Sequence, residues 1–208
     1  MNALWLALAW LGYAALHSTL ASFGAKEWAA RRWPAFAPWY RLAFNAVAFV
    51  TVLPILWASY AIEAPMLWQW PGPWRWLSNG LALAALAGFA ATARWYDMGT
   101  FLGLRQIRER ERRPDGHEGF RLSPFHRFVR HPWYSFGLVL VWTGDKNLPL
   151  LVSALAISIY FVVGSRLEEK KLLALHGDAY RRYMERVPGL IPLPWKRLSA
   201  AEARAFGG

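Results

Sequence analysis

Residues 3–23 read ALWLALAWLGYAALHSTLASF, a run of 21 residues without a charged side chain. A helix needs about 20 apolar residues to cross the hydrocarbon core of a bilayer, so this run predicts a membrane span. No Lys or Arg precedes it, which is unlike the basic start of a signal peptide. The run therefore indicates an integral membrane protein.

Four further apolar runs follow. Residues 42–62 form an uncharged run of 21 with Pro54 inside it, a residue expected to kink a helix. Residues 76–93 and 148–165 number 18 each, whereas residues 133–144 number only 12 and are too short to cross unaided. A polar turn at residues 145–147 separates the last two runs. We predict an all-α integral membrane fold with about five transmembrane helices, the last two a helical hairpin, plus cytoplasmic amphipathic helices. One of the latter is expected over residues 95–113.

The basic residues gather on one side of this arrangement. Of the 24 Lys and Arg residues, only Arg75 and Lys146 fall on the other side. The positive-inside rule makes the basic side cytoplasmic, with the N-terminus outside and the C-terminus inside, as in a bacterial inner membrane. The net charge of +11 comes with no nucleic-acid-binding motif, so we expect contact with membrane lipids and not with nucleic acid. The absence of cysteine excludes disulfides and thiol chemistry by the protein itself.

Charged side chains cluster where the last two runs meet the basic side. Arg130 and His131 precede Pro132, which suits the first turn of a helix, where backbone N–H groups and the helix dipole favour an anion. Glu168 and Glu169 follow the last run at the membrane exit. The pair is either a binding site or solvated charges that neighbouring lysines neutralise.

Aromatic residues accompany these charges, namely Tyr134, Tyr180 and Tyr183. A cationic site, carboxylates and aromatic faces together suit a zwitterionic cofactor with a carboxylate, an amine, a ribose and a sulfonium, because a sulfonium is attracted to aromatic faces. Methyl transfer from a sulfonium depends on positioning more than on acid–base chemistry, so the lack of an evident nucleophile is no objection.

Four spaced motifs now make a family resemblance specific. Arg-His-Pro-x-Tyr-x-x-Gly at 130–137 is followed by Glu-Glu-x-x-Leu at 168–172, Gly-x-x-Tyr-x-x-Tyr at 177–183 and Val-Pro-x-x-Ile-Pro at 187–192. This order resembles the isoprenylcysteine carboxyl methyltransferase superfamily. The resemblance implies an S-adenosylmethionine-dependent methyltransferase, with S-adenosylhomocysteine as product. Residues 1–93 would be an N-terminal three-span membrane region, and residues 94–208 a catalytic region with a cytoplasmic connector, the hairpin and a C-terminal helix beginning near Glu168.

The resemblance also implies residue roles. Arg130 and His131 would hold the cofactor carboxylate, and one of the two glutamates its amine or ribose; Glu168 is favoured because it lies nearer the membrane. Tyr180 and Tyr183 either line the pocket or anchor the interface, and Gly137 serves helix packing, close approach of the cofactor, or both. Catalytic candidates are His126, Arg130 and Glu168; cofactor-binding candidates are Arg130, His131, Pro132, Tyr134, Gly137, Glu168, Glu169, Tyr180 and Tyr183. The histidines lack tight ligand spacing, so no metal site is predicted.

The N-terminal half refines the resemblance. His17 and Ser18 in the first run, and Asp97 with the stretch FLGLRQ at 101–106, are similar to the NnrU and methanethiol S-methyltransferase branch. This implies a small or lipophilic acceptor that reaches the site through the bilayer, contacted by His17, Ser18, Arg105 and Gln106. The branch favours a thiol acceptor, for which His126 is a candidate base. Left open are an isoprenylcysteine-type carboxylate or a lipid amine as acceptor, a purely structural His17, and a non-catalytic NnrU-like respiratory membrane protein.

Overall fold

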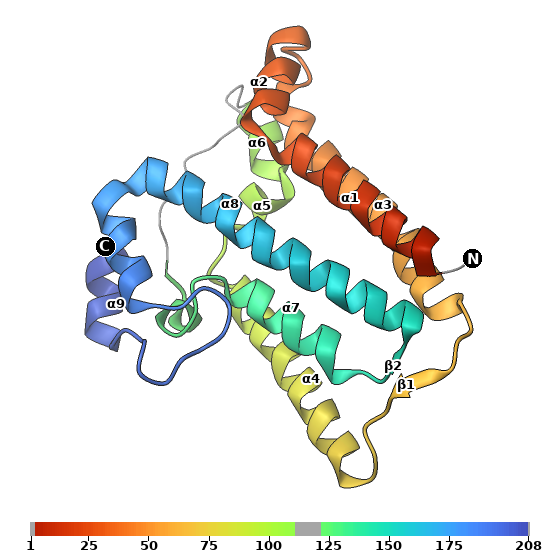
Figure 1. The fold of residues 1–208 in the computed structure, drawn as a ribbon. Helices are drawn as coiled ribbons and strands as arrows, with labels where there is room; N and C mark the ends of the chain where they lie inside the picture. Colours follow the sequence, from red (N-terminus) through yellow and green to blue (C-terminus); the bar gives the residue numbers. More distant parts are fainter. Residues whose placement is uncertain (1–2, 111–121, 208) are drawn as a thin grey trace. The chain divides into compact units, whose positions relative to one another are not determined.

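A computed structural model describes residues 3–110 and 122–207 of the chain (Figure 1). Four helical segments in this part are long and apolar enough to cross a membrane: Ala3–Ala21, Ala37–Ala61, Pro73–Ala93 and Leu148–Arg186. The prediction of an all-α integral membrane protein is confirmed. The fourth apolar run forms α7, Pro132–Thr143. Its 12 residues rise only ~18 Å, short of the ~30 Å hydrocarbon core, so four of the five apolar runs form helices long enough to span within the described residues.

The chain divides into two compact units. The first contains the described residues within 1–67, 96–118 and 146–156, and the second those within 68–95, 119–145 and 157–208. Unit 1 holds α1 (Ala3–Ala21), α2 (Phe23–Arg32), η1 (Ala37–Trp39), α3 (Tyr40–Ala61), α5 (Met98–Leu102) and α6 (Leu104–Arg108). It also holds β2 (Lys146–Asn147), most of β1 (Met66–Trp68), with which β2 pairs, and the first turns of α8 (Leu148–Arg186). Within it α1 lies alongside α3 (Figure 1).

A buried chain of side-chain hydrogen bonds joins three helices of unit 1. Trp10 of α1 donates its Nε1–H to Ser153 Oγ of α8 at 2.9 Å, and Ser153 Oγ lies 2.7 Å from Ser59 Oγ of α3. All three residues are at most 5% exposed. Helices in lipid gain no hydrophobic drive from meeting one another, so packing and polar bonds of this kind hold them together.

Ser153→Ala removes both of these interhelical bonds. We expect a loss of about 1 kcal/mol in the free energy of unfolding, the usual scale for polar bonds between membrane helices. Unfolding in detergent should be compared with that of Ser165→Ala. The Ser165 hydroxyl is buried in the same helix, and among the described residues it bonds to its own helix alone, at Val162 O, 2.9 Å away. Equal effects of the two substitutions would contradict the interhelical role.

The connector after the Pro73–Ala93 helix folds onto the start of α3. Arg41 Nε and Asn45 Nδ2 both donate to Phe101 O, at 3.1 and 2.9 Å. Residues 98–108 form the two short helices α5 and α6 in place of the single helix predicted over 95–113, of which residues 111–113 lie outside the described part. Gly103 makes the break, because its φ of +91° is left-handed and ends α5.

Gly103→Ala tests this junction. A Cβ at position 103 would lie 2.6 Å from the backbone nitrogen of Leu42, so both the left-handed conformation and a clash with main chain oppose the substitution. We expect unfolding to become easier by about 2 kcal/mol. Gly12→Ala is the matched control, because a Cβ at position 12 in α1 meets no atom within 4 Å. Destabilisation no greater than that of the control would show that the connector adjusts freely.

Unit 2 holds α4 (Pro73–Ala93), η2 (Pro124–Arg127), α7, the rest of α8, and α9 (Ala200–Gly207). α4 packs along α7 (Figure 1), and Trp133 Nε1 donates to Thr92 Oγ1 at 2.6 Å between them. α7 and α8 form the predicted hairpin: Trp142 Nε1 donates to Ser158 Oγ at 3.0 Å, and the Tyr134 and Phe161 rings stack 5.0 Å apart.

Helix α8 continues without a break past the end of the last apolar run. The C-terminal helix was predicted to begin near Glu168. In the structure Glu168 lies inside α8 instead. It follows Leu148 by a rise of ~30 Å, the thickness of the hydrocarbon core, which puts it where the span ends. The break comes at Gly177, with φ 53° and ψ −129°. Beyond it the chain turns back and packs Tyr180, Tyr183, Val187 and Leu198 into one core.

Candidate functional site

The Arg-His-Pro segment pairs with the Val-Pro-Gly-Leu segment through the main chain. Arg130 N donates to Pro188 O at 2.8 Å, and His131 N donates to Gly189 O at 3.1 Å. One turn into α7, Ser135 Oγ donates to Leu190 O at 2.6 Å. Two motifs far apart in the sequence are thereby held together at the start of α7.

A buried ion pair fastens α8 to this junction. Arg130 Nε and Nη2 lie 2.9 and 2.7 Å from Glu169 Oε1, and Arg130 Nη1 donates to Met184 O at 3.1 Å and also to Val187 O. The Arg130 and Glu169 side chains are only 12% and 6% exposed. Charges buried to this degree are tolerated only when they are paired and hydrogen-bonded. Most donors of the Arg130 guanidinium are thus engaged by the protein itself.

His131 bridges the two glutamates. Its Nε2 lies 3.1 Å from Glu169 Oε1, and its Nδ1 lies 3.4 Å from Glu168 Oε2. Burial alone would lower the pKa of His131, but hydrogen bonds and charges from both glutamates outweigh burial and raise that pKa. The imidazolium form is therefore favoured. Glu169 is buried, whereas the Glu168 side chain is 49% exposed, so Glu168 is the carboxylate that a ligand can reach.

Tyr134 lies between two rings. It stacks on His131 at 5.5 Å with 13° between the planes, and on Phe161 at 5.0 Å with 7°. A Cβ at Gly137 would lie 2.7 Å from the Phe161 ring, so this glycine lets α7 approach α8 closely. Gly137 was predicted to serve helix packing, close approach of the cofactor, or both, and the structure shows the helix packing.

Tyr180 and Tyr183 are core residues. Each is 1% exposed, which excludes the alternative that they anchor the membrane interface. The Tyr183 hydroxyl donates to His126 O at 2.7 Å and so joins the helix after Gly177 to η2. Because both side chains are buried, they can support the site by packing.

His126 closes η2. Its Nδ1 accepts the Ser123 backbone N–H at 3.0 Å and lies 2.8 Å from Ser123 Oγ. A ring nitrogen that accepts an N–H carries no proton, so the neutral ring holds its proton on Nε2. Burial, helped by the charge of His131, lowers the pKa of His126 to about 4. This geometry favours a structural role over that of a base near neutral pH.

The candidate acceptor residues all lie in unit 1. His17 packs against Tyr13 and Phe44, with ring centroids 5.7 and 4.6 Å away, while Ser18 is exposed on the same helix. Arg105 is engaged by Asp97 at 3.0 Å and by Glu109 at 2.9 Å.

Gln106 is the unusual member of this group. Its Nε2 donates to Thr100 O at 3.1 Å, whereas its Oε1 is buried without a hydrogen-bond partner among the residues that the structure describes. Asp97, recognised from the sequence only as part of a motif, caps α5 through Thr100 N and Oγ1. Those contacts, with Arg105, lower the pKa of Asp97 to about 2.

In unit 2 the structure brings together Arg130, His131, Tyr134, Glu168 and Glu169. It adds two residues that sequence reasoning missed, Ser135 and Phe161, both of which contact members of this cluster or the loop bound to it. Neither carried a signal, since a serine or a phenylalanine in an apolar run is ordinary. We call Arg130, His131, Tyr134, Glu168 and Glu169 the Arg-His-Glu cluster.

Curated relatives carry one name. The chain is 38% identical over 100 residues to the methanethiol S-methyltransferase of Crocosphaera subtropica, covering 46% of this chain and 38% of that protein. It is 32% identical over 186 residues to methanethiol S-methyltransferase 2 of Bradyrhizobium diazoefficiens, covering 86% and 69%. It is 31% identical over 195 residues to the Mycobacterium tuberculosis methanethiol S-methyltransferase, covering 88% and 75%. No protein-family model and no solved structure matches the chain. From the identity and coverage of the second and third relatives, the chain belongs to the methanethiol S-methyltransferase family.

Proposed function

We propose that the chain is an integral membrane methyltransferase that transfers a methyl group from S-adenosylmethionine to a small thiol, methanethiol being the first candidate. The observation that carries the proposal is the likeness, over most of the chain, to relatives named for this reaction. The Arg-His-Glu cluster supports it, because the cluster lies where the apolar part of α8 ends, a level that both a water-soluble cofactor and a lipophilic acceptor would be able to reach.

The groups at this site suit the parts of S-adenosylmethionine. No side chain caps the start of α7, and the adjoining His131 has a raised pKa, so this end of the helix suits a carboxylate. The half-exposed Glu168 carboxylate suits an amine or a ribose hydroxyl, and the Tyr134 ring suits a flat base or a sulfonium. When bound, the cofactor supplies an electrophilic methyl group. Within this proposal Arg130 and Glu169 are positioning residues, which hold His131 and the 187–190 loop in place.

The acceptor thiol must lose its proton, so the reaction rate should depend on pH. The attacking species is the thiolate, and His126 with a pKa of about 4 is poorly matched to forming it. The rate at subsaturating thiol should then rise about tenfold per pH unit until the pKa of the thiol is reached. Initial rates of S-adenosylhomocysteine formation between pH 6 and 9 check this, measured with methanethiol and with a more acidic thiol. A plateau at the same pH for both thiols would instead reveal a base in the protein.

We also propose that the cofactor site faces the cytoplasm of a bacterial cell and that the N-terminus lies outside the inner membrane, because nearly all basic residues fall on one side of the spans. Since the chain lacks cysteine, single cysteines report cleanly on topology. An impermeant maleimide should label Glu63→Cys, at an exposed position after α3, in intact spheroplasts but label Arg182→Cys only after lysis. The reverse pattern would invert the orientation.

Calorimetric binding of S-adenosylhomocysteine to the detergent-purified protein tests the cofactor directly. We expect saturable binding that Glu168→Gln weakens about tenfold, as for a lost charge-assisted hydrogen bond. Lys170→Gln, two residues along the same helix and exposed, should leave binding unchanged. No binding by a folded preparation would favour the non-catalytic NnrU-like membrane protein.

A further inference from the structure

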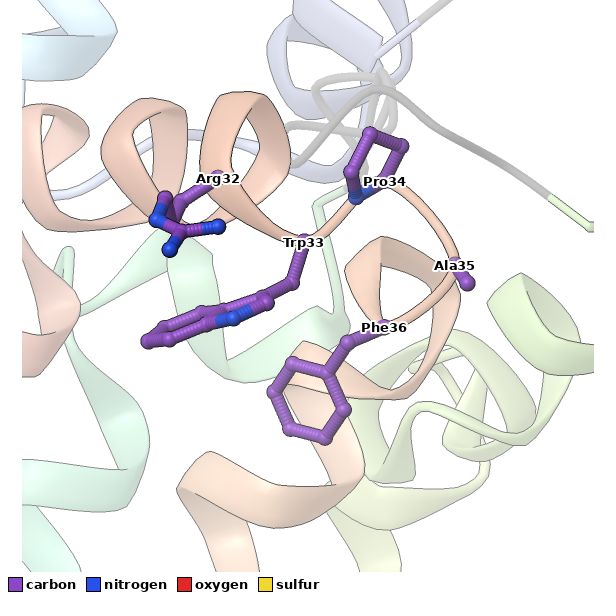
Figure 2. A pocket seen from close by; sticks show the side chains of 5 residues that line it. All are labelled: Arg32, Trp33, Pro34, Ala35 and Phe36. Atoms are coloured by element: carbon purple, nitrogen blue, oxygen red, sulfur yellow. The ribbon is translucent and has the colours of Figure 1, made fainter.

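Two adjoining hollows run along the link between α2 and α3. The first is lined by Arg32, Trp33, Pro34, Ala35 and Phe36, whose side chains are drawn in Figure 2. The second shares Ala35 and Phe36 and continues over the first turns of α3, at Trp39, Leu42, Ala43 and Ala46. The two hollows therefore adjoin at Ala35 and Phe36, with a cation lining the first and apolar residues lining the second. We call the two together the 32–46 groove.

The aromatic walls of the groove are fixed by the backbone. Phe36 N donates to Trp33 O at 2.9 Å and Trp39 N to Phe36 O at 2.8 Å, so successive turns present an aromatic residue every third position. Pro34 and Pro38 lie within these turns and restrict the backbone further. These rings remain 41–48% exposed. Because the spanning segment begins at Ala37, the rings lie where a span enters the membrane interface.

Arg32, the cation at the end of the groove, differs from Arg31 in its contacts. Arg32 lies over the Trp33 ring at 5.9 Å, as Figure 2 shows, and forms no ion pair with any residue in 3–110 or 122–207. Arg31 next to it is paired with Glu27 at 3.6 Å and lines neither hollow. The guanidinium of Arg32 thus lies against the Trp33 ring without an acidic partner among the described residues, beside apolar surface at the start of a spanning segment.

We propose that the 32–46 groove binds one anionic phospholipid. The phosphate would pair with the guanidinium of Arg32, a group suited to bidentate phosphate contacts. One acyl chain would lie over Phe36, Trp39 and the small residues Ala43 and Ala46, along the direction in which α3 enters the bilayer. Charge complementarity selects an anionic lipid, and the apolar floor selects a lipid over a free phosphate. This inference does not depend on the methyltransferase reaction.

Native mass spectrometry of the detergent-purified chain, titrated with dioleoyl phosphatidylglycerol, tests the headgroup end. We expect one lipid to bind more tightly than the rest, with about fivefold weaker binding in Arg32→Gln, the usual effect of one basic residue at an anionic lipid surface. Arg31→Gln is the matched control and should change that binding less than twofold. Equal weakening by both substitutions would show diffuse charge attraction and overturn the proposal, as would equally tight binding of dioleoyl phosphatidylcholine.

The apolar end has its own test. Ala46→Leu fills the floor of the groove at an exposed position and should weaken binding of the same lipid severalfold, whereas Ala84→Leu, exposed on α4, should not. Glycerol phosphate at millimolar concentration should fail to displace the lipid, because it lacks the chain. Displacement by glycerol phosphate, or indifference to Ala46→Leu, would reduce the site to a surface anion contact and overturn the lipid assignment. Thermal unfolding of each variant establishes that the fold is retained.

Discussion

Glu169→Gln should lower the free energy of unfolding by about 3–5 kcal/mol, the usual cost of removing one partner of a buried ion pair. The amide cannot balance the charge of Arg130, whose side chain is 12% exposed, and it also leaves His131 without its closest carboxylate. Denaturant unfolding in detergent, followed by tryptophan fluorescence, measures the loss. We further expect S-adenosylhomocysteine binding to fall with stability in this variant.

Glu168→Gln is the matched control for this prediction. It makes the same chemical change one residue earlier, but the Glu168 side chain is 49% exposed and 3.4 Å from His131. Its effect on unfolding should stay below about 1 kcal/mol, as for exposed charge pairs, while its effect on cofactor binding should be large. If the two variants unfolded alike, the buried pair would not be what secures the junction between α7 and α8.

Acidification between pH 6.5 and 4 should destabilise the protein through His126 by up to about 3 kcal/mol. Burial lowers the pKa of His126 to about 4, so the unfolded chain binds a proton in this window and the folded chain does not. The stabilisation is present above the unfolded pKa of about 6.5 and is lost as the pH falls through the folded value. The free energy of unfolding measured from pH 7 to 4 follows the loss.

His126→Asn supplies the comparison, since the amide oxygen can still accept the Ser123 N–H but does not titrate. The difference in stability between wild type and this variant should shrink as the pH falls, because carboxylates titrate alike in both. His131 acts with the opposite sign: its raised pKa gives stability that is present below about pH 6.5 and lost as the pH rises through its folded pKa. A difference independent of pH below 6.5 would show that His126 is not buried neutral.

The sequence predicts those features of the fold that depend on local composition. Uncharged runs of about 20 residues have few alternatives to spanning a membrane, so α1, α3, α4 and the start of α8 were identified. A glycine favours a break in a helix, and Gly177 interrupts α8, because it adopts a positive φ. The pairing of the 130–132 and 187–190 segments was not predicted, because no local pattern in the sequence encodes a main-chain contact between two distant segments.

Features set by tertiary contacts could not be predicted. Glu168 and Glu169 are adjacent, so their directions on the helix differ by ~100°, and only the position of Arg130 decides which one is buried. Tyr180 and Tyr183 look like interface anchors until α9 and residues 187–198 cover them. The break at Gly103 was missed because a single glycine within a helical pattern is often tolerated.

The transfer of a labelled methyl group tests the central proposal most directly. Purified protein is incubated with S-adenosylmethionine carrying a trideuterated methyl group and with methanethiol, and the headspace is analysed by gas chromatography and mass spectrometry. We predict dimethyl sulfide with one trideuterated methyl, formed with S-adenosylhomocysteine in equal amount. At subsaturating cofactor its rate of formation should fall about tenfold in Glu168→Gln and stay unchanged in Lys170→Gln. Labelled product on a prenylcysteine analogue or on a phospholipid amine, with none on methanethiol, would contradict the thiol assignment. No labelled product on any of these acceptors would contradict the methyltransferase itself.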